Sequence, residues 1–101
     1  MRSNSSRPYP KAAEATSGPN TYTIVIEAMA FKPQVLTLRR GDHVRWVNRD
    51  LFAHTVTQTG ALFDSKELQP GATWTWTAGA SGTFPYICAF HPTMNGKLTV
   101  Q

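Results

Sequence analysis

The stretch from 86 to 96, YICAFHPTMNG, holds three side chains that could bind a metal ion together. Cys88, the single cysteine, is followed by His91 three residues later and by Met94 six residues later. A thiolate, an imidazole and a thioether are soft ligands that suit copper as it alternates between Cu(I) and Cu(II). One more imidazole would complete a trigonal His₂Cys plane with a weak axial Met, an arrangement that transfers single electrons. The spacing therefore predicts a copper site.

Two histidines remain as candidates for the second imidazole. His54 lies in the apolar stretch LFAHTV and is the better candidate. His43 follows the Gly41–Asp42 turn at the start of a predicted strand and has no other soft residue near it in the sequence. We interpret His43 as a surface histidine of that strand. Alone, Cys88 would be a small buried hydrophobe and Met94 a core residue, so the prediction depends on their joint spacing.

Two other classes of protein use similar residues. A Cys–His pair can act as nucleophile and base in a hydrolase, but Cys88 and His91 are only three residues apart on one loop, and no orienting acid is evident. We therefore predict no catalytic residues and no enzyme. A copper carrier or storage domain, or an accessory domain of a larger copper protein, would use the same ligands and stays open as an alternative.

The composition and charge distribution of the chain exclude further classes of protein. A chain of 101 residues with 41% hydrophobic and 16% charged residues is typical of one globular domain. Its net charge of +4 divides equally between residues 1–20 and 21–101, and no basic run is longer than Arg39–Arg40. This distribution predicts no nucleic-acid binding. No apolar stretch approaches the ~20 residues of a transmembrane segment, and no intact signal peptide precedes the domain.

The elements that must position the candidate ligands are predicted to be strands. Residues 1–20 are rich in Ser, Pro and Gly and are predicted to be a flexible tail or linker, with the domain over 21–101. From residue 21 the apolar positions alternate, as in Tyr22, Ile24 and Ile26, and no helical period persists. This pattern predicts an all-β sandwich, with a break at 28–33 and an irregular segment at 59–69. The predicted strands are 21–27, 35–38, 43–47, 52–57, 72–77, 83–88 and 96–101.

The stretches GDHVRWVNRD (41–50) and GTFPYIC (82–88), with the ligand candidates that follow each, resemble blue copper proteins (cupredoxins) of the plastocyanin and amicyanin type. The two residues between His91 and Met94 match the amicyanin pattern. The resemblance covers residues 21–101 and implies a Greek-key β-sandwich that carries single electrons. It also implies one copper per chain, bound by His54, Cys88, His91 and Met94, and a location in the periplasm or otherwise outside the cytoplasm.

The residues around the two histidines predict how the protein contacts its partners. His91, on the loop, is expected to be the partly exposed ligand through which the electron enters and leaves. The two histidines are flanked by apolar residues that are expected to form a patch around His91: Leu51, Phe52, Ala53, Phe90 and Pro92. Such a patch suits transient docking of redox protein partners by a monomer.

Three positions depart from the family pattern. Ala53 stands where proline is usual, Thr55 where asparagine is usual, and Ala89 where threonine or serine is usual. In the family the last two positions are joined by a hydrogen bond that ties the ligand loop to the segment of His54. Because Ala89 has no hydroxyl, the sequence leaves open how this loop is braced.

Overall fold

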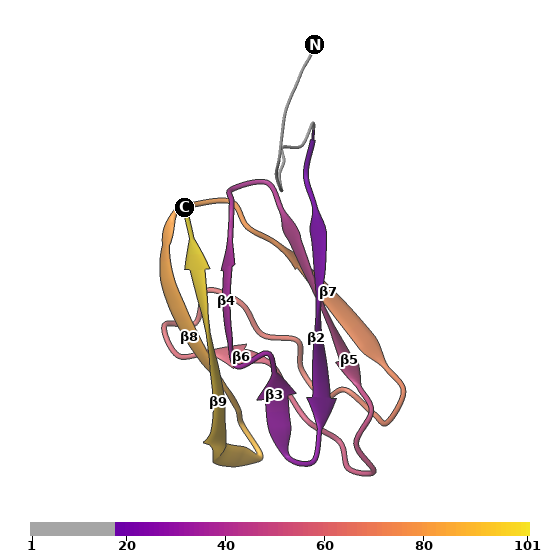
Figure 1. The fold of residues 1–101 in the computed structure, drawn as a ribbon. Coiled ribbons are helices and arrows are strands. Elements are labelled where there is room, and N and C mark those ends of the chain that lie inside the picture. The colour runs from indigo at the N-terminus through magenta and orange to yellow at the C-terminus, as the bar shows by residue number, and fades with distance from the viewer. Residues whose placement is uncertain (1–17) are drawn as a thin grey trace.

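The structure, a computed structural model, describes residues 18–101 and consists of strands joined by turns and loops (Figure 1). Residues 1–17 of the predicted tail lie outside the described residues, so the domain boundary at residue 20 stays a prediction. The all-β class is confirmed. The strands are β2 (Thr21–Glu27), β3 (Ala30–Lys32), β4 (Val35–Leu38), β5 (His43–Asn48), β6 (Thr57–Gln58), β7 (Thr73–Thr77), β8 (Gly82–Cys88) and β9 (His91–Val100).

The strands form two sheets of four, in the orders β3-β2-β5-β7 and β4-β9-β8-β6. In each sheet one pair is parallel, β2 with β5 and β4 with β9, and the other pairs are antiparallel. Neither parallel pair is made by strands that are neighbours in the sequence, so the connections must cross from sheet to sheet. The two sheets pack face to face, as in other β-sandwiches.

Aromatic side chains fill the space between the sheets. Trp46 of β5 is fully buried, and its ring centroid is 5.5 Å from Trp74, 5.5 Å from Tyr86 and 6.0 Å from Phe63. Trp46 belongs to the first sheet and Tyr86 to the second, so this contact joins the two layers. Aromatic pairs at such distances contribute about 0.5–1.5 kcal/mol beyond the burial of their area.

Three predicted boundaries were wrong. The break at 28–33 contains a short strand, β3, which follows a tight turn at Ala28 and Met29. The strand predicted at 52–57 is mostly a loop, with an isolated bridge between His54 and Leu68 and a two-residue strand, β6. The last strand begins at His91 and not at residue 96, so the loop after Cys88 is shorter than expected. The irregular segment 59–69 nevertheless supplies Phe63 and Leu68 to the core.

The candidate ligands collect at one end of this sandwich. Figure 1 shows the β2–β3 turn, the segment that follows β5 and the β8–β9 turn together at the lower end. His54 lies in the second of these segments, and Cys88 and His91 bound the third. The fold therefore brings together residues that are more than thirty positions apart in the sequence.

Candidate metal centre

His54 and Cys88 contact each other in the interior. Both are fully buried, and Cys88 Sγ lies 3.5 Å from His54 Nδ1. A sulfur and a nitrogen that bind one ion at about 2.3 Å and about 2.0 Å, the distances typical of zinc, are about 3.5 Å apart when the angle between them is about 110°. The two donor atoms are thus placed as two ligands of a single small ion.

The backbone of His54 is held on both sides. Its N–H donates to Leu68 O at 3.1 Å, and its carbonyl accepts from Leu68 N–H at 2.7 Å. The fully buried Asn48 shapes the loop before it: Nδ2 donates to Phe52 O and to Leu68 O, both at 2.9 Å, and Oδ1 accepts from Asp50 N–H. These side-chain bonds replace a sheet ladder, which explains why residues 52–56 do not form the predicted strand.

Asp50 is a residue of the site that the sequence analysis did not identify. Its Oδ2 lies 2.9 Å from His54 Nε2 and also accepts from Met29 N–H at 3.0 Å. Burial raises the pKa of this carboxyl, but hydrogen bonds from Met29, His54 and Leu51 outweigh burial, so the net pKa is lower than usual. A carboxylate four residues before a candidate ligand histidine was the available signal.

The thiol of Cys88 is tied to the segment of His54 through Thr55. Thr55 N–H donates to Cys88 Sγ at 3.4 Å, and Thr55 Oγ1 accepts from Ala89 N–H at 2.7 Å. The sequence left the bracing of the loop open because Ala89 has no hydroxyl. The structure shows that Thr55 supplies the hydroxyl and that residue 89 contributes only its backbone, so the two segments are joined after all.

His91 is held less firmly than His54. It begins β9, is partly exposed, and its ring centroid is 5.6 Å from that of His54 at an interplanar angle of 61°. Its ring has no hydrogen bond to any residue in 18–101. Across this part of the chain, no three side chains of the His, Cys, Asp and Glu types are grouped closely enough to hold a metal ion by themselves. His91 thus lies beside His54 without forming a closed set of ligands with Cys88.

Met94 is buried and His43 lies away from the segment of His54, and the role of each stays a prediction. Met94 is 5% exposed and belongs to the same buried cluster as Cys88, which suits an inward-facing thioether. His43 begins β5 and is therefore separated by the length of that strand from the segment that carries His54. Its Nδ1 lies 2.8 Å from Thr77 Oγ1 on the neighbouring strand. The structure thus brings His54 and Cys88 into contact, places His91 beside them and leaves His43 apart.

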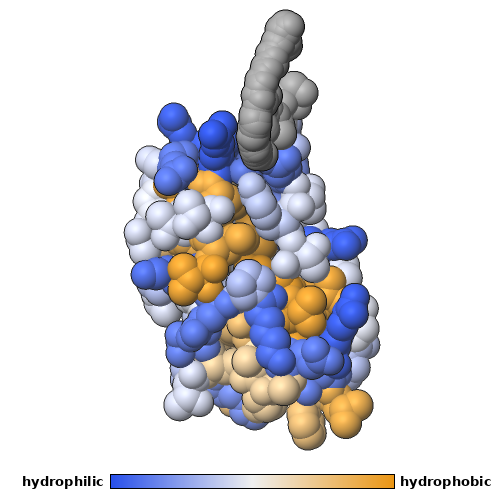
Figure 2. Space-filling view, viewed as in Figure 1, coloured by the Kyte–Doolittle hydropathy of each residue, from blue (hydrophilic) through white to orange (hydrophobic). Residues whose placement is uncertain are grey.

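Apolar side chains are exposed around the two candidate imidazoles. Leu51, Phe52 and Phe90 are 87%, 59% and 51% exposed, and Met29, which the sequence analysis did not include, is 40% exposed. We call these four residues the apolar rim. Figure 2 shows apolar surface at the lower end of the molecule, where Figure 1 places the β2–β3 turn. Pro92 is also exposed and extends this surface beside His91.

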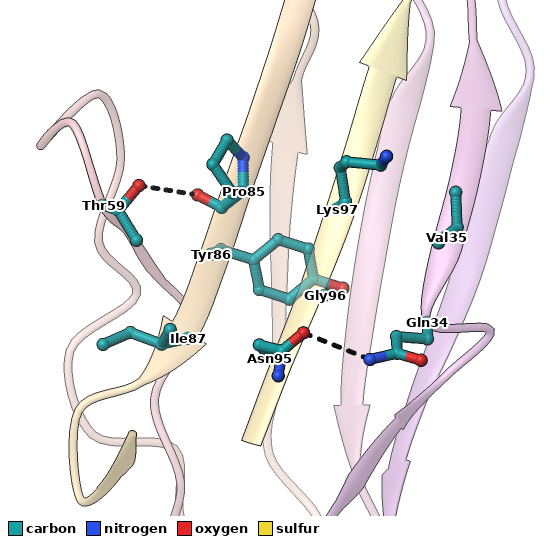
Figure 3. Close-up of a pocket in the computed structure, with 9 residues that line it drawn as sticks. All are labelled: Gln34, Val35, Thr59, Pro85, Tyr86, Ile87, Asn95, Gly96 and Lys97. Carbon is teal, nitrogen blue, oxygen red and sulfur yellow. Dashed lines mark hydrogen bonds between the residues drawn. The ribbon is translucent and has the colours of Figure 1, made fainter. Parts of the chain in front are cut away.

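A hollow of about 480 Å³ lies on the sheet that contains β4, β9 and β8 (Figure 3). Its lining includes Gln34, Asn95 and Lys97, with a hydrogen bond of 3.1 Å from Gln34 Nε2 to Asn95 Oδ1. None of the lining residues is His, Cys, Asp, Glu or Met. This hollow therefore offers no soft ligand for copper, and the candidate centre is at the end of the sandwich.

Residues 6–100 match the family model described as a cupredoxin-like domain. The chain belongs to the cupredoxin-like family. It is 28% identical over 95 residues to amicyanin of Paracoccus denitrificans, which covers 89% of this chain and 71% of that protein. It is 28% identical to plastocyanin of Scenedesmus fuscus, over 73% of this chain and 89% of that protein. A purple cupredoxin from Nitrosopumilus maritimus superposes with a TM-score of 0.74 and 26% identity, over 79% of this chain and 99% of that one.

Family membership fixes the general class of the protein. Cupredoxins are small β-sandwich proteins that carry single electrons on one copper ion, so the predicted family, Greek-key fold and copper cofactor are confirmed. The donor types at the end of the sandwich (two imidazoles, a thiol and a thioether) fit a copper ion of this kind. Within residues 18–101, no helix has the length and apolar character needed to span a membrane.

Proposed function

We propose that this cupredoxin is a one-electron carrier that holds one copper ion through His54, Cys88, His91 and Met94. The observation that carries the proposal is the 3.5 Å contact between Cys88 Sγ and His54 Nδ1 in the fully buried interior. Copper bound by such a set alternates between Cu(I) and Cu(II) with a thiolate and two imidazoles in a plane and a weak axial thioether.

Each residue has a separate task in this proposal. Cys88 binds as a thiolate, since coordination removes the thiol proton, and Thr55 N–H donates to its sulfur. His54 is fixed by the fold and changes little between oxidation states, which keeps reorganisation small. Partly exposed His91 provides the path for the electron to and from solvent-facing partners. Met94 supplies the long axial contact that helps to set the potential.

We further propose that the partners are redox proteins that dock transiently on the apolar rim around His91 and on Pro92. The exposed Phe52 and Phe90 support this, because apolar surface next to a redox ligand favours short-lived contact. The chain acts as a monomer outside the cytoplasm, where its amicyanin and plastocyanin relatives suggest it works, and it is not itself an enzyme. Residues 1–20 serve as a tail or linker.

Adding Cu(II) to the full-length protein and recording a visible spectrum tests the ligand set. We expect one copper per chain and an intense absorption from charge transfer between Cys88 and Cu(II). Cys88→Ser should abolish the absorption, and the matched imidazole control His43→Ala should leave it unchanged. Loss of the absorption in His43→Ala would show that the wrong imidazole had been assigned.

The alternative is a copper carrier or storage domain built from the same ligands. An electron carrier retains its metal through repeated cycles, whereas a metal carrier releases it. The copper-loaded protein should therefore be reduced and reoxidised many times in the presence of a chelator without losing its absorption. Transfer of the copper to the chelator during the first cycles would favour the storage alternative.

A further inference from the structure

Asp50 is a mostly buried carboxylate whose position is fully determined by hydrogen bonds. Its side chain is 12% exposed. Oδ2 contacts His54 Nε2 at 2.9 Å and accepts from Met29 N–H at 3.0 Å, while Oδ1 accepts from Leu51 N–H at 3.2 Å. Its own N–H donates to Asn48 Oδ1 at 2.9 Å. A carboxylate held by so many partners has one orientation, and that orientation faces a proposed copper ligand.

The contact determines which nitrogen of His54 is free. A carboxylate only accepts hydrogen bonds, so His54 Nε2 must carry the hydrogen that lies between it and Asp50. In the neutral ring the lone pair is then on Nδ1, the atom that lies 3.5 Å from Cys88 Sγ. The tautomer that can bind a metal beside Cys88 is thus selected before any metal binds.

The charge of Asp50 also acts on a bound ion. An anion that accepts a hydrogen bond from the far nitrogen makes the imidazole a stronger donor. A stronger donor and a nearby negative charge both favour the ion of higher charge, Cu(II), over Cu(I). The midpoint potential should therefore be lower with Asp50 present than without it.

Asp50 links this ligand to a strained turn. Ala28 and Met29 have φ values of 54° and 60°, and two consecutive non-glycine residues in the left-handed region are costly. Met29 N–H points to the same Oδ2 atom that contacts His54. The β2–β3 turn, which presents Met29 to the apolar rim, is therefore connected to the copper ligand through one oxygen atom.

We propose that Asp50 is a positioning residue that fixes the Nε2–H tautomer of His54, lowers the midpoint potential of the copper site and joins that site to the β2–β3 turn. This inference rests on the proposed function for its effect on potential. Its effect on the tautomer does not require copper, so the two can be tested apart.

The first experiment is ¹⁵N NMR of the His54 ring in the full-length wild-type chain without added metal. We expect the hydrogen on Nε2. A hydrogen on Nδ1 would overturn the proposal, whether or not the chain later binds copper. Conversely, an Nε2–H ring in a chain that develops no absorption with Cu(II) would contradict the proposed function and leave the tautomer assignment standing.

The second experiment compares midpoint potentials of the copper-loaded wild type, Asp50→Asn and the control Asp64→Asn. Asparagine keeps the size and an accepting oxygen but removes the charge. Asp64 is an exposed carboxylate beside Lys66, and it accepts hydrogen bonds from Thr57 and Lys66 and not from a proposed copper ligand. We expect Asp50→Asn to change the ratio of Cu(I) to Cu(II) affinity about tenfold in favour of Cu(I), or about +59 mV. Asp64→Asn should change it much less. Equal shifts, or a lower potential in Asp50→Asn, would overturn the proposal.

Discussion

His54 and His91 are the same side chain in two different settings. His54 is fully buried, its backbone is bonded to Leu68 on both sides, and its far nitrogen meets a carboxylate. His91 is partly exposed, and its ring has no hydrogen bond to the rest of residues 18–101. The first is placed by the interior of the sandwich and the second by a short turn at its surface. In the proposed copper site, His54 would therefore be the fixed ligand and His91 the adjustable one, on the surface where we propose that a partner docks.

The largest expected effect separates the two histidines directly. When His91→Gly is loaded with Cu(II), added imidazole should restore the visible absorption, because the missing ring leaves an opening to solvent. His54→Gly should not recover at the same imidazole concentration, since its cavity is enclosed by the core. Titration of imidazole into both variants, followed by visible spectroscopy, measures this. Equal recovery would mean that imidazole reaches both positions equally well and would contradict the difference in burial between His54 and His91.

Strand β8, which leads to the β8–β9 turn, contains a group that should lower the stability of the protein at high pH. Tyr86 lies in β8 two residues before Cys88, and burial raises its pKa to about 12, with a smaller opposite effect from Trp46. The unfolded chain ionises this group near its ordinary value of 10.0. The raised pKa therefore adds its full contribution to the free energy of unfolding below pH 10, and this contribution is lost as the pH rises toward 12. The loss amounts to about 3 kcal/mol.

Urea unfolding between about pH 9 and about pH 12 tests this. Tyr86→Phe should lack that part of the decrease. Because the Tyr86 hydroxyl has no hydrogen-bond partner within residues 18–101, the variant should lose little stability at neutral pH. Tyr22→Phe keeps Tyr86 and should follow the wild type. If Tyr86→Phe loses stability with pH as steeply as Tyr22→Phe, the buried phenol is not responsible.

Docking of a redox partner should depend on the exposed apolar rim beside His91. Phe90→Glu places a charge in the apolar rim and should slow electron exchange with a redox partner by about tenfold, equivalent to about 1.4 kcal/mol. Thr93→Glu adds the same charge to an exposed polar position near the start of β9 and should slow it much less. Stopped-flow kinetics at several salt concentrations measures both, with only a weak salt dependence for the wild type. A steep salt dependence, or equal slowing, would point to a charged docking surface.

The smallest effect concerns the bond that joins the two segments. Thr55→Val keeps the shape of the side chain but removes the acceptor of Ala89 N–H, which should cost about 1 kcal/mol of unfolding free energy. Thr57→Val removes a neighbouring hydroxyl without leaving a backbone N–H unpaired and should cost less. Urea unfolding of the two variants gives the difference. If the two costs are the same, the segments are not held together through Thr55.

The residues with metal chemistry were visible in the sequence because ligand types are few and their spacing on one turn is short. Cys88, His91 and Met94 form such a group, and the alternation of Ile24, Ile26, Val44 and Trp46 predicted which strand faces are buried. All four of these are fully buried. Local pattern was therefore sufficient to predict the fold class and to select three of the four candidate ligands.

What could not be predicted depends on contacts between distant segments. The bond from Asp50 to Met29 joins residues 21 positions apart, and that from Ala89 to Thr55 joins residues 34 positions apart. Asn48 replaces a strand ladder with side-chain bonds, so residues 52–56 do not form the predicted strand. The parallel pairing of β4 with β9 likewise has no local signature. The charge and hydrogen-bonding groups of these residues determine their partners only after the fold has brought the residues together.

The burial of Cys88 also protects the chain before it receives its metal. Oxidants and foreign disulfides attack a thiol that is ionised and within reach of solvent. Cys88 is fully buried and is the single cysteine, so it has no partner in its own chain and is shielded from those of others. At the proposed location outside the cytoplasm, a newly made molecule would therefore keep its sulfur reduced until it binds copper. The same packing that holds the ligand in place thus preserves its chemistry until it is used.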